Sequence, residues 1–186
     1  MSATPASNIV LLVGLPGVGK TTLANALSAR LGGQILSRDL IRDSIFPPVY
    51  LDYSPEQNQV ATDTLLHVLD YLLRRHRPPC LIIDGKPFSR SREVRSVLAL
   101  AARHDAALHV VHCDAPLDTI RRRLADGLAD AVNRRAERTP QKAQRIHDAF
   151  EPLDVPHLKV EMTRPLDAIV EQVADYLGLP QRNEAR

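Results

Sequence analysis

Short apolar runs alternate with longer amphipathic stretches along the 186 residues of this chain. The apolar runs have the length of buried strands, and the longer stretches repeat apolar residues at the spacing of one helical face. The predicted strands are Ile9–Val13, Gln34–Ser37, Cys80–Asp84, Ala107–Cys113 and Leu158–Met162. The predicted helices are Thr22–Leu31, Leu40–Phe46, Pro55–Arg77, Arg92–His104, Ala115–Ala125, Pro140–Ala149 and Pro165–Leu177. This alternation predicts an α/β fold with three layers, a doubly wound, parallel five-stranded sheet covered by helices on both faces.

Local signals mark where several of these helices begin and end. Ser54-Pro55-Glu56-Gln57 is a capping box with proline in the first turn, and Thr139-Pro140 starts a later helix in a similar way. No internal repeat or low-complexity linker divides the sequence, so we expect one domain over residues 1–186. Residues 125–139 are rich in arginine and have a weaker core-facing pattern. They are predicted to form a mobile helical lid, or alternatively a solvated helical connection.

Composition narrows the classes of partner. The net charge is only +2 and aromatic residues make up 4% of the chain, so bulk charge predicts neither general nucleic-acid binding nor membrane binding. No apolar run is long enough to cross a bilayer. The N-terminus lacks the pattern of a signal peptide, and both cysteines fall in predicted buried strands, so we expect a cytoplasmic protein with reduced thiols.

The strongest motif lies between the first predicted strand and the first predicted helix. Residues 14–21 read GLPGVGKT and fit the phosphate-binding P-loop pattern G-x-x-x-x-G-K-[ST]. Glycines let the backbone curl around phosphate, and the helix N-terminus that follows adds partial positive charge. Lys20 is predicted to reach the β- and γ-phosphates, and the Thr21 hydroxyl to bind Mg²⁺. The predicted nucleotide contacts here are Gly14, Pro16, Gly17, Val18, Gly19, Lys20, Thr21 and Thr22.

A second cluster follows the second predicted strand. Asp39 and Arg42 are three residues apart at the start of a helix, at the edge where parallel sheets bind ligands. Asp39 is a candidate general base for a hydroxyl, and Arg42 a candidate contact for an anionic part of the acceptor. The alternative is structural, with Asp39 capping the helix and Arg42 pairing with it or with Asp43. Asp84, at the end of the third strand, is a candidate Mg²⁺ ligand acting through water.

These motifs resemble small P-loop kinases of the nucleoside-monophosphate-kinase type. The D-x-x-R element of residues 39–42 is most similar to the branch that contains polynucleotide 5′-kinases, zeta toxins and chloramphenicol phosphotransferase. In that branch the aspartate is the general base and the arginine contacts acceptor or phosphate. The resemblance implies the same roles for Asp39 and Arg42, and it implies that Asp84-Gly85 organises Mg²⁺ through water.

The resemblance also bears on the lid and on the adenine site. Thr163-Arg164-Pro165 resembles the loop that borders adenine, and Arg123 is a further candidate nucleotide contact. These kinases usually carry a lid arginine near the position of Gly127, where this sequence has none. Arg134 and Arg138 are the candidates to stabilise transferred charge instead, from a remodelled lid.

The sequence as a whole predicts an ATP-dependent kinase, with GTP as an alternative nucleotide, that uses Mg²⁺ to phosphorylate a hydroxyl of a small molecule. A nucleoside, a sugar and an antibiotic all remain candidate acceptors. Two other functions stay open: a polynucleotide 5′-hydroxyl kinase, disfavoured by the scarcity of aromatic residues, and a nucleotide-dependent switch or ATPase that acts through a protein partner. The oligomeric state is not predicted.

Overall fold

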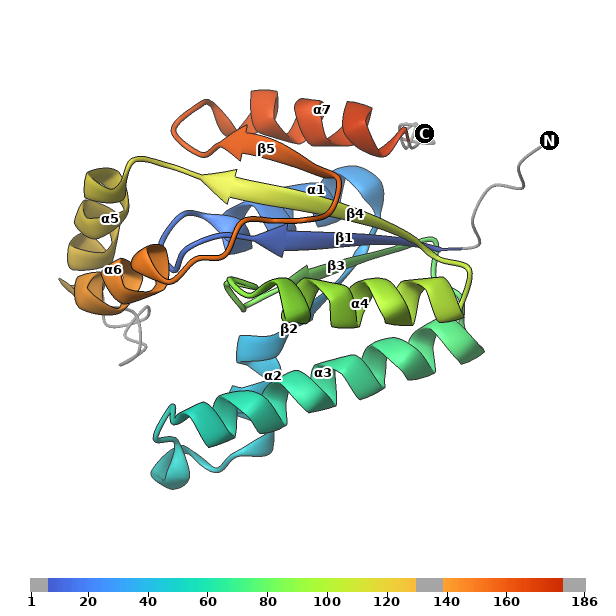
Figure 1. Ribbon diagram of the computed structural model, residues 1–186, viewed down its shortest axis with the longest axis horizontal. Coiled ribbons are helices and arrows are strands. Elements are labelled where there is room, and N and C mark those ends of the chain that lie inside the picture. The colour runs from blue at the N-terminus through green and yellow to red at the C-terminus, as the bar shows by residue number, and fades with distance from the viewer. Residues whose placement is uncertain (1–6, 130–138, 179–186) are drawn as a thin grey trace.

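The computed structural model describes residues 7–129 and 139–178, and within them the central element is a parallel five-stranded sheet (Figure 1). The strand order is β2-β3-β1-β4-β5, so the first strand lies in the middle. Every pair of neighbours is parallel, which confirms the predicted sheet. The strands are β1 (Asn8–Val13), β2 (Gln34–Ser37), β3 (Cys80–Asp84), β4 (Ala107–Asp114) and β5 (His157–Glu161).

Helices cover both faces of this sheet and so complete the three predicted layers (Figure 1). Helices α1 and α7 pack on one face, and α3 and α4 pack on the other. The helical elements are α1 (Lys20–Leu31), α2 (Arg38–Ile45), the 3₁₀ turn η1 (Pro48–Tyr50), α3 (Pro55–Arg75), α4 (Ser91–Arg103), α5 (Leu117–Ala129), α6 (Pro140–Asp148) and α7 (Leu166–Leu177).

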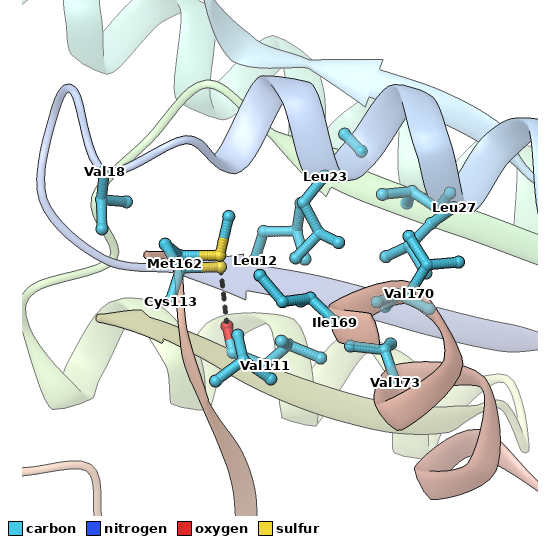
Figure 2. Close-up of a cluster of buried hydrophobic side chains, with 14 of the residues drawn as sticks. Leu12, Val18, Leu23, Leu27, Val111, Cys113, Met162, Ile169, Val170 and Val173 are labelled. Atoms are coloured by element: carbon cyan, nitrogen blue, oxygen red, sulfur yellow. Dashed lines mark hydrogen bonds between the residues drawn. The ribbon is translucent and has the colours of Figure 1, made fainter. Parts of the chain in front are cut away.

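The alternation of side chains along β1 divides the core between the two faces. Leu12 points toward α1 and α7, where it packs with residues such as Leu23 and Ile169 (Figure 2), and Val10 belongs to the same cluster. Their neighbours along the strand point the opposite way, toward α3 and α4. All six β1 residues are buried. Full burial of one such aliphatic side chain contributes about 1.5–3 kcal/mol, so β1 is firmly held at the centre of the sheet.

Short polar side chains set the helix starts that the sequence predicts. Ser54 Oγ accepts a hydrogen bond from the Gln57 N–H at 3.2 Å, and α3 begins at Pro55 as expected. Thr139 Oγ1 caps α6 in the same manner. Helix α2 begins earlier than predicted, at Arg38, because Ser37 is its N-cap.

Helix α5 extends further than the sequence pattern indicated. It is helical through Ala129, so residues 125–129 of the predicted lid continue this helix. The rest of the predicted lid up to residue 138 lies outside the described residues, and Arg134 and Arg138 lie there. None of the described helices is both long and apolar enough to span a bilayer.

Candidate active site

The loop after β1 is shaped by a close approach to the two neighbouring strands. The Gly14 N–H donates to the Pro87 carbonyl at 3.0 Å. Gly14 has a φ of +143°, and a Cβ there would lie 2.3 Å from the carbonyl oxygen of Cys113. Only glycine fits this position, because any side chain would collide with the backbone of β4.

Lys20 lies folded over the same loop. Its Nζ donates to the carbonyls of Gly14 at 2.7 Å and Leu15 at 2.8 Å, and the residue is 8% exposed. The first turn of α1 begins at this lysine, so the ammonium group and the helix N-terminus face the same space. Both features attract an anion such as phosphate.

Thr21, in the first turn of α1, contacts Asp84 at the end of β3. The Thr21 hydroxyl donates to Asp84 Oδ2 at 2.8 Å. Asp84 is 2% exposed, and its other oxygen, Oδ1, is buried with no hydrogen-bond partner among the described residues. A buried carboxylate oxygen of this kind needs a donor or a cation. The pair therefore fits the predicted Mg²⁺ site.

Asp39 is carried next to Asp84 by the pairing of β2 with β3. Ser37 and Asp84 are partners in the register, and Asp39 follows in the first turn of α2. Gly85, with a φ of +90°, allows the chain after β3 to pass against this turn. A Cβ on Gly85 would lie 2.8 Å from the backbone nitrogen of Asp39.

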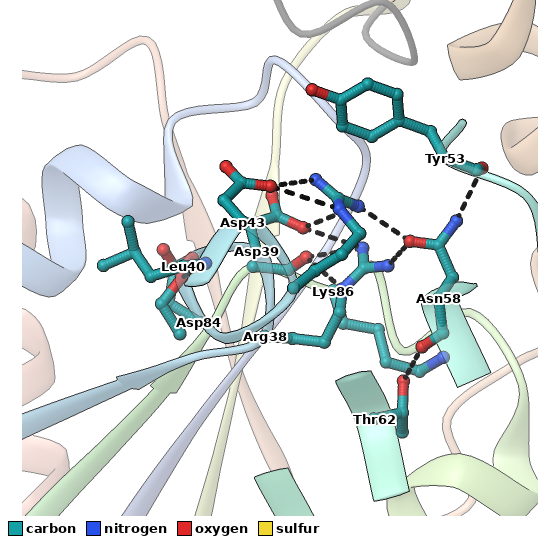
Figure 3. A network of polar contacts seen from close by, with 12 residues as sticks. Arg38, Asp39, Leu40, Asp43, Tyr53, Asn58, Thr62, Asp84 and Lys86 are labelled. Atoms are coloured by element: carbon teal, nitrogen blue, oxygen red, sulfur yellow. Dashed lines mark hydrogen bonds and ion pairs between the residues drawn. The ribbon is translucent and has the colours of Figure 1, made fainter. Parts of the chain in front are cut away.

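Two arginines flank the carboxylate of Asp39, and Asn58 bridges the arginines; Figure 3 shows Arg38 and Asn58 beside Asp39. Asp39 Oδ1 lies 3.1 Å from Arg38 Nη2 and 3.5 Å from Arg42 Nη1. Asn58 Oδ1, from α3, accepts hydrogen bonds from both arginines, at 2.7 Å from Arg42 Nη1. The Asn58 amide donates to the Tyr53 carbonyl at 3.0 Å, which fixes its orientation. The network ties α2 to α3 and holds Asp39 in place.

The buried position of Arg42 changes the role expected for it. Its side chain is fully buried, pairs with Asp43 at 3.2 Å, and lies under the Tyr53 ring, with Cζ 4.5 Å from the ring centroid. This confirms the predicted pairing with Asp39 and Asp43, whereas the capping alternative for Asp39 is wrong because Ser37 is the cap. Arg42 thus contacts Asp39 from inside the protein, and it is not among the residues that line the cavity beside Asp39.

One cavity of about 320 Å³ joins the phosphate loop to Asp39. Its walls come from the phosphate loop, the start of α2, α3, the segment after β3, and α6. The predicted residues that line it are Pro16, Gly17, Gly19, Lys20, Thr21, Thr22, Asp39 and Asp84. Gly14 and Val18 do not line it but shape the loop, and Val18 is buried in the core.

The cavity also contains charged residues that sequence reasoning missed or underrated. Arg38, Lys86 and Lys142 line it, in addition to Lys20. Three of the four lysines in the chain therefore face one cavity, although arginine is five times as common as lysine in the sequence. The rarity of lysine could therefore have marked these lysines as candidate site residues from the sequence alone. Among the described lining residues, four cations face two carboxylates, a local excess of two positive charges.

The two arginines predicted to border the nucleotide contact other groups. Arg123 donates to the Val18 carbonyl at 2.9 Å and to the Met162 carbonyl at 2.8 Å, so it joins the phosphate loop to the segment after β5. Arg164 Nη1 donates to Gln172 Oε1 on α7 at 2.7 Å. Their contacts with a nucleotide stay a prediction.

The strand order, the phosphate loop after the central strand and the aspartate at the adjacent strand end define a P-loop protein of the nucleoside-monophosphate-kinase-like class. Within that class, the chain belongs to the AAA domain family, whose model matches residues 9–153.

Solved structures with the same fold include several kinases. APS kinase from Mycobacterium tuberculosis is 22% identical, with a TM-score of 0.69 over 95% of this chain and 100% of that one. Shikimate kinase from Acinetobacter baumannii is 15% identical, with a TM-score of 0.64 over 93% and 94%. The tunicamycin resistance protein of Deinococcus radiodurans is 19% identical, with a TM-score of 0.65 over 95% and 99%. At these identities the likeness shows a shared fold.

One curated relative matches part of the chain. The chromosome transmission fidelity protein 18 homolog of Xenopus laevis is 29% identical over 102 residues. The match covers 55% of this chain and only 9% of that protein.

Proposed function

We propose that this protein is an ATP-dependent phosphotransferase that moves the γ-phosphoryl group to a hydroxyl of a small molecule. The observation that carries the proposal is the shared cavity. Lys20 and the Thr21–Asp84 pair form one wall, and Asp39 lies on another. A phosphate group and an attacking hydroxyl can therefore meet in one enclosed space, as phosphoryl transfer requires. The solved kinases of this fold support the same reading.

Asp39 acts in this proposal as the general base. Its carboxylate accepts the proton of the acceptor hydroxyl while the new O–P bond forms and the bond to the β-phosphate oxygen breaks, releasing ADP. Arg38 and Arg42 hold Oδ1 in place through the Asn58 bridge, so the orientation of the base is set before the acceptor binds.

The cations around the cavity stabilise the charge that moves onto the leaving phosphate. Lys20 exchanges its bonds with the Gly14 and Leu15 carbonyls for phosphate oxygens, and Lys142 approaches from α6. Thr21 and Asp84 would hold Mg²⁺, which neutralises phosphate charge and aligns the γ-phosphoryl group. ATP is the proposed nucleotide, with GTP as the alternative. Arg123 and Arg164 are the proposed neighbours of the purine ring of that nucleotide.

The test separates nucleotide binding from transfer. Asp39→Asn should reduce turnover below detection in an ADP-release assay with a panel of nucleosides, sugars and antibiotics, and calorimetry should show an unchanged affinity for Mg-ATP. Lys20→Ala should slow transfer by about 10²–10³-fold, because loss of one preorganised charge costs about 3–4 kcal/mol in barrier. The matched control is Asp43→Asn, which removes the other acid paired with Arg42 but does not line the cavity.

Two results would contradict the proposal. If Asp39→Asn lost nucleotide affinity but kept normal turnover, Asp39 would not be the base. If hydrolysis needed no acceptor and instead responded to an added protein, the chain would be a switch or ATPase.

A further inference from the structure

Arg38 lies between the helix cap Ser37 and the proposed base Asp39, and it lines the candidate active-site cavity. The residue is only 6% exposed, so its guanidinium group is held inside the protein. The D-x-x-R element directs attention to Arg42 instead, which is not among the residues that line this cavity. Arg38 is therefore the arginine of α2 that borders the reacting groups.

The contacts of Arg38 come from three different elements. Its Nε and Nη2 donate to the Gly85 carbonyl at 3.0 and 2.7 Å, and Gly85 directly follows Asp84 at the end of β3. Nη2 also lies 3.1 Å from Asp39 Oδ1. Nη1 donates to Asn58 Oδ1 on α3 (Figure 3). One planar guanidinium group thus joins the end of β3, the first turn of α2 and the first turn of α3.

Arg42 holds the same carboxylate from a different side. Its Nη1 lies 3.5 Å from Asp39 Oδ1, and the side chain also pairs with Asp43 and stacks on Tyr53. Asp43 belongs to α2, and Tyr53 to the loop before α3. These contacts fix the base relative to its own helix, whereas the contacts of Arg38 fix it relative to strand β3.

The link to β3 matters because the strand pairing holds α2 only at its start. β2 is an edge strand of four residues, and its register with β3 ends at the Ser37–Asp84 pair. The spacing between Asp39 and the end of β3 therefore depends on contacts beyond the ladder. A reacting group that moves by about 1 Å can lose 10²-fold in rate, so this spacing affects catalysis directly.

We propose that Arg38 is a positioning residue, which sets the distance between the base Asp39 and the phosphate side of the site through its two bonds to the Gly85 carbonyl. This inference rests on the proposed function and assigns a role to a residue that the motifs leave out. Arg38 acts through Asp39, so its loss should lower kcat and leave the binding of Mg-ATP and acceptor unchanged.

The first test replaces the planar fork while keeping its charge. Arg38→Lys presents one ammonium group, which cannot reproduce the four bonds of the guanidinium. We expect kcat to fall by about tenfold or more, and the acceptor KM and the Mg-ATP affinity to stay within about twofold of the wild type. ADP release is measured with a panel of nucleosides, sugars and antibiotics and with water alone as the acceptor, and Mg-ATP binding is measured by calorimetry.

Two kinetic results would overturn the inference. A wild-type kcat in Arg38→Lys would show that positive charge alone is sufficient at this position. A raised acceptor KM at normal kcat would show that Arg38 contacts the acceptor and does not act through Asp39.

Amide hydrogen exchange gives a second readout that needs no acceptor. In the presence of a nonhydrolysable ATP analogue, the amides of α2 should exchange about tenfold faster in Arg38→Lys, while those of α1 keep their wild-type rates. Arg38→Gln, which removes the charge as well, should give the same pattern and provides a second variant if Arg38→Lys does not fold. Unchanged exchange in α2, or an equal acceleration in α1, would overturn the inference.

Arg30→Lys is the matched control. Arg30 also makes a two-bond contact, from Nε and Nη2 to the Glu171 carboxylate at 3.0 and 3.3 Å, but it joins α1 to α7 and does not line the cavity. This variant should change neither kcat nor the exchange of α2. Equal effects of Arg30→Lys and Arg38→Lys would refute the assignment to Arg38.

The outcomes also separate this inference from the function beneath it. Failure of the wild type to bind the ATP analogue, or to turn over with any acceptor, would refute the phosphotransferase proposal, while exchange in α2 would still decide the role of Arg38. Equal turnover by the wild type and Arg38→Lys would refute only the inference about Arg38.

Discussion

Gly85 lies between the strand end that carries Asp84 and the helix turn that carries Asp39. One methyl group added at Gly85 should push these two parts of the site apart. The Gly85 φ of +90° is strained for any residue with a side chain, and the added Cβ would lie 2.8 Å from the Asp39 nitrogen and 3.0 Å from Ser37 Oγ. The Gly85 carbonyl also accepts two hydrogen bonds from Arg38. Gly85→Ala therefore pushes directly on the helix turn that carries the proposed base.

The cost of this substitution has two parts. The left-handed backbone conformation costs an alanine about 1–2 kcal/mol, and overpacking against α2 costs about 1–3 kcal/mol more. In a chain of this length each kcal/mol lowers the melting temperature by roughly 2–4 °C, so a fall of roughly 10 °C is expected. Because a shift of about 1 Å in a reacting group can cost 10²-fold in rate, kcat should fall by about tenfold or more.

The matched control isolates backbone strain from steric contact. Gly178 also has a positive φ, +59°, but a Cβ there would meet nothing within 4 Å. Gly178→Ala should lower the melting temperature by only about 4 °C and leave kcat unchanged. Thermal unfolding, kcat and the Mg-ATP dissociation constant are measured for both variants. The reasoning fails if the two variants melt within about 2 °C of each other, or if Gly85→Ala keeps the wild-type kcat.

Two further predictions concern buried polar groups. Asn58→Ala removes the oxygen that lies 2.7 Å from Nη1 of the buried Arg42, so the free energy of unfolding should fall by about 2–4 kcal/mol. We expect kcat to fall at unchanged Mg-ATP affinity, and we expect Asn58→Asp to retain the fold. Equal stability of the wild type and Asn58→Ala in urea would refute this prediction. Burial raises the pKa of the Cys80 thiol to about 11 and that of Cys113 to about 12. Unfolded thiols ionise near about pH 8.5, so the stability from these neutral thiols should be lost as pH rises from about 8.5 to about 11 for Cys80 and to about 12 for Cys113. A disulfide reagent at pH 8 should find neither thiol reactive in the native protein and both reactive after denaturation, and rapid native reaction would contradict the burial.

The fold was predictable because nearly every element is marked locally. The β2 and β3 strands match their predicted ranges, and the starts of α3 and α6 follow from Ser54 and Thr139. Errors fall at element ends, where packing competes with pattern. Helix α3 stops at Arg75 instead of Arg77, because Arg77 adopts a positive φ of 45°.

The site was only half predictable. Motif spacing located Lys20, Thr21 and Asp84, since their places follow from the strand–loop–helix order. The sequence could not show that Arg42 lies buried behind Asp39, or that Asn58 bridges two arginines from another helix. Those contacts depend on how α2 packs against α3, which no local pattern records. Lys142 was missed because α6 reaches the cavity only through the tertiary fold.

The place of β2 at the rim of the sheet has a consequence for how the molecule yields under stress. β1, which holds the phosphate loop, has hydrogen-bonded neighbours on both sides, whereas β2 is four residues long and is bonded to β3 alone. Local unfolding requires the least free energy at such an edge strand. A low urea concentration should therefore abolish turnover while the nucleotide still binds. Amide hydrogen exchange should be fast around Asp39 and slow along β1. The nucleotide would thus be bound by the stable centre of the sheet, and the acceptor by its less stable edge.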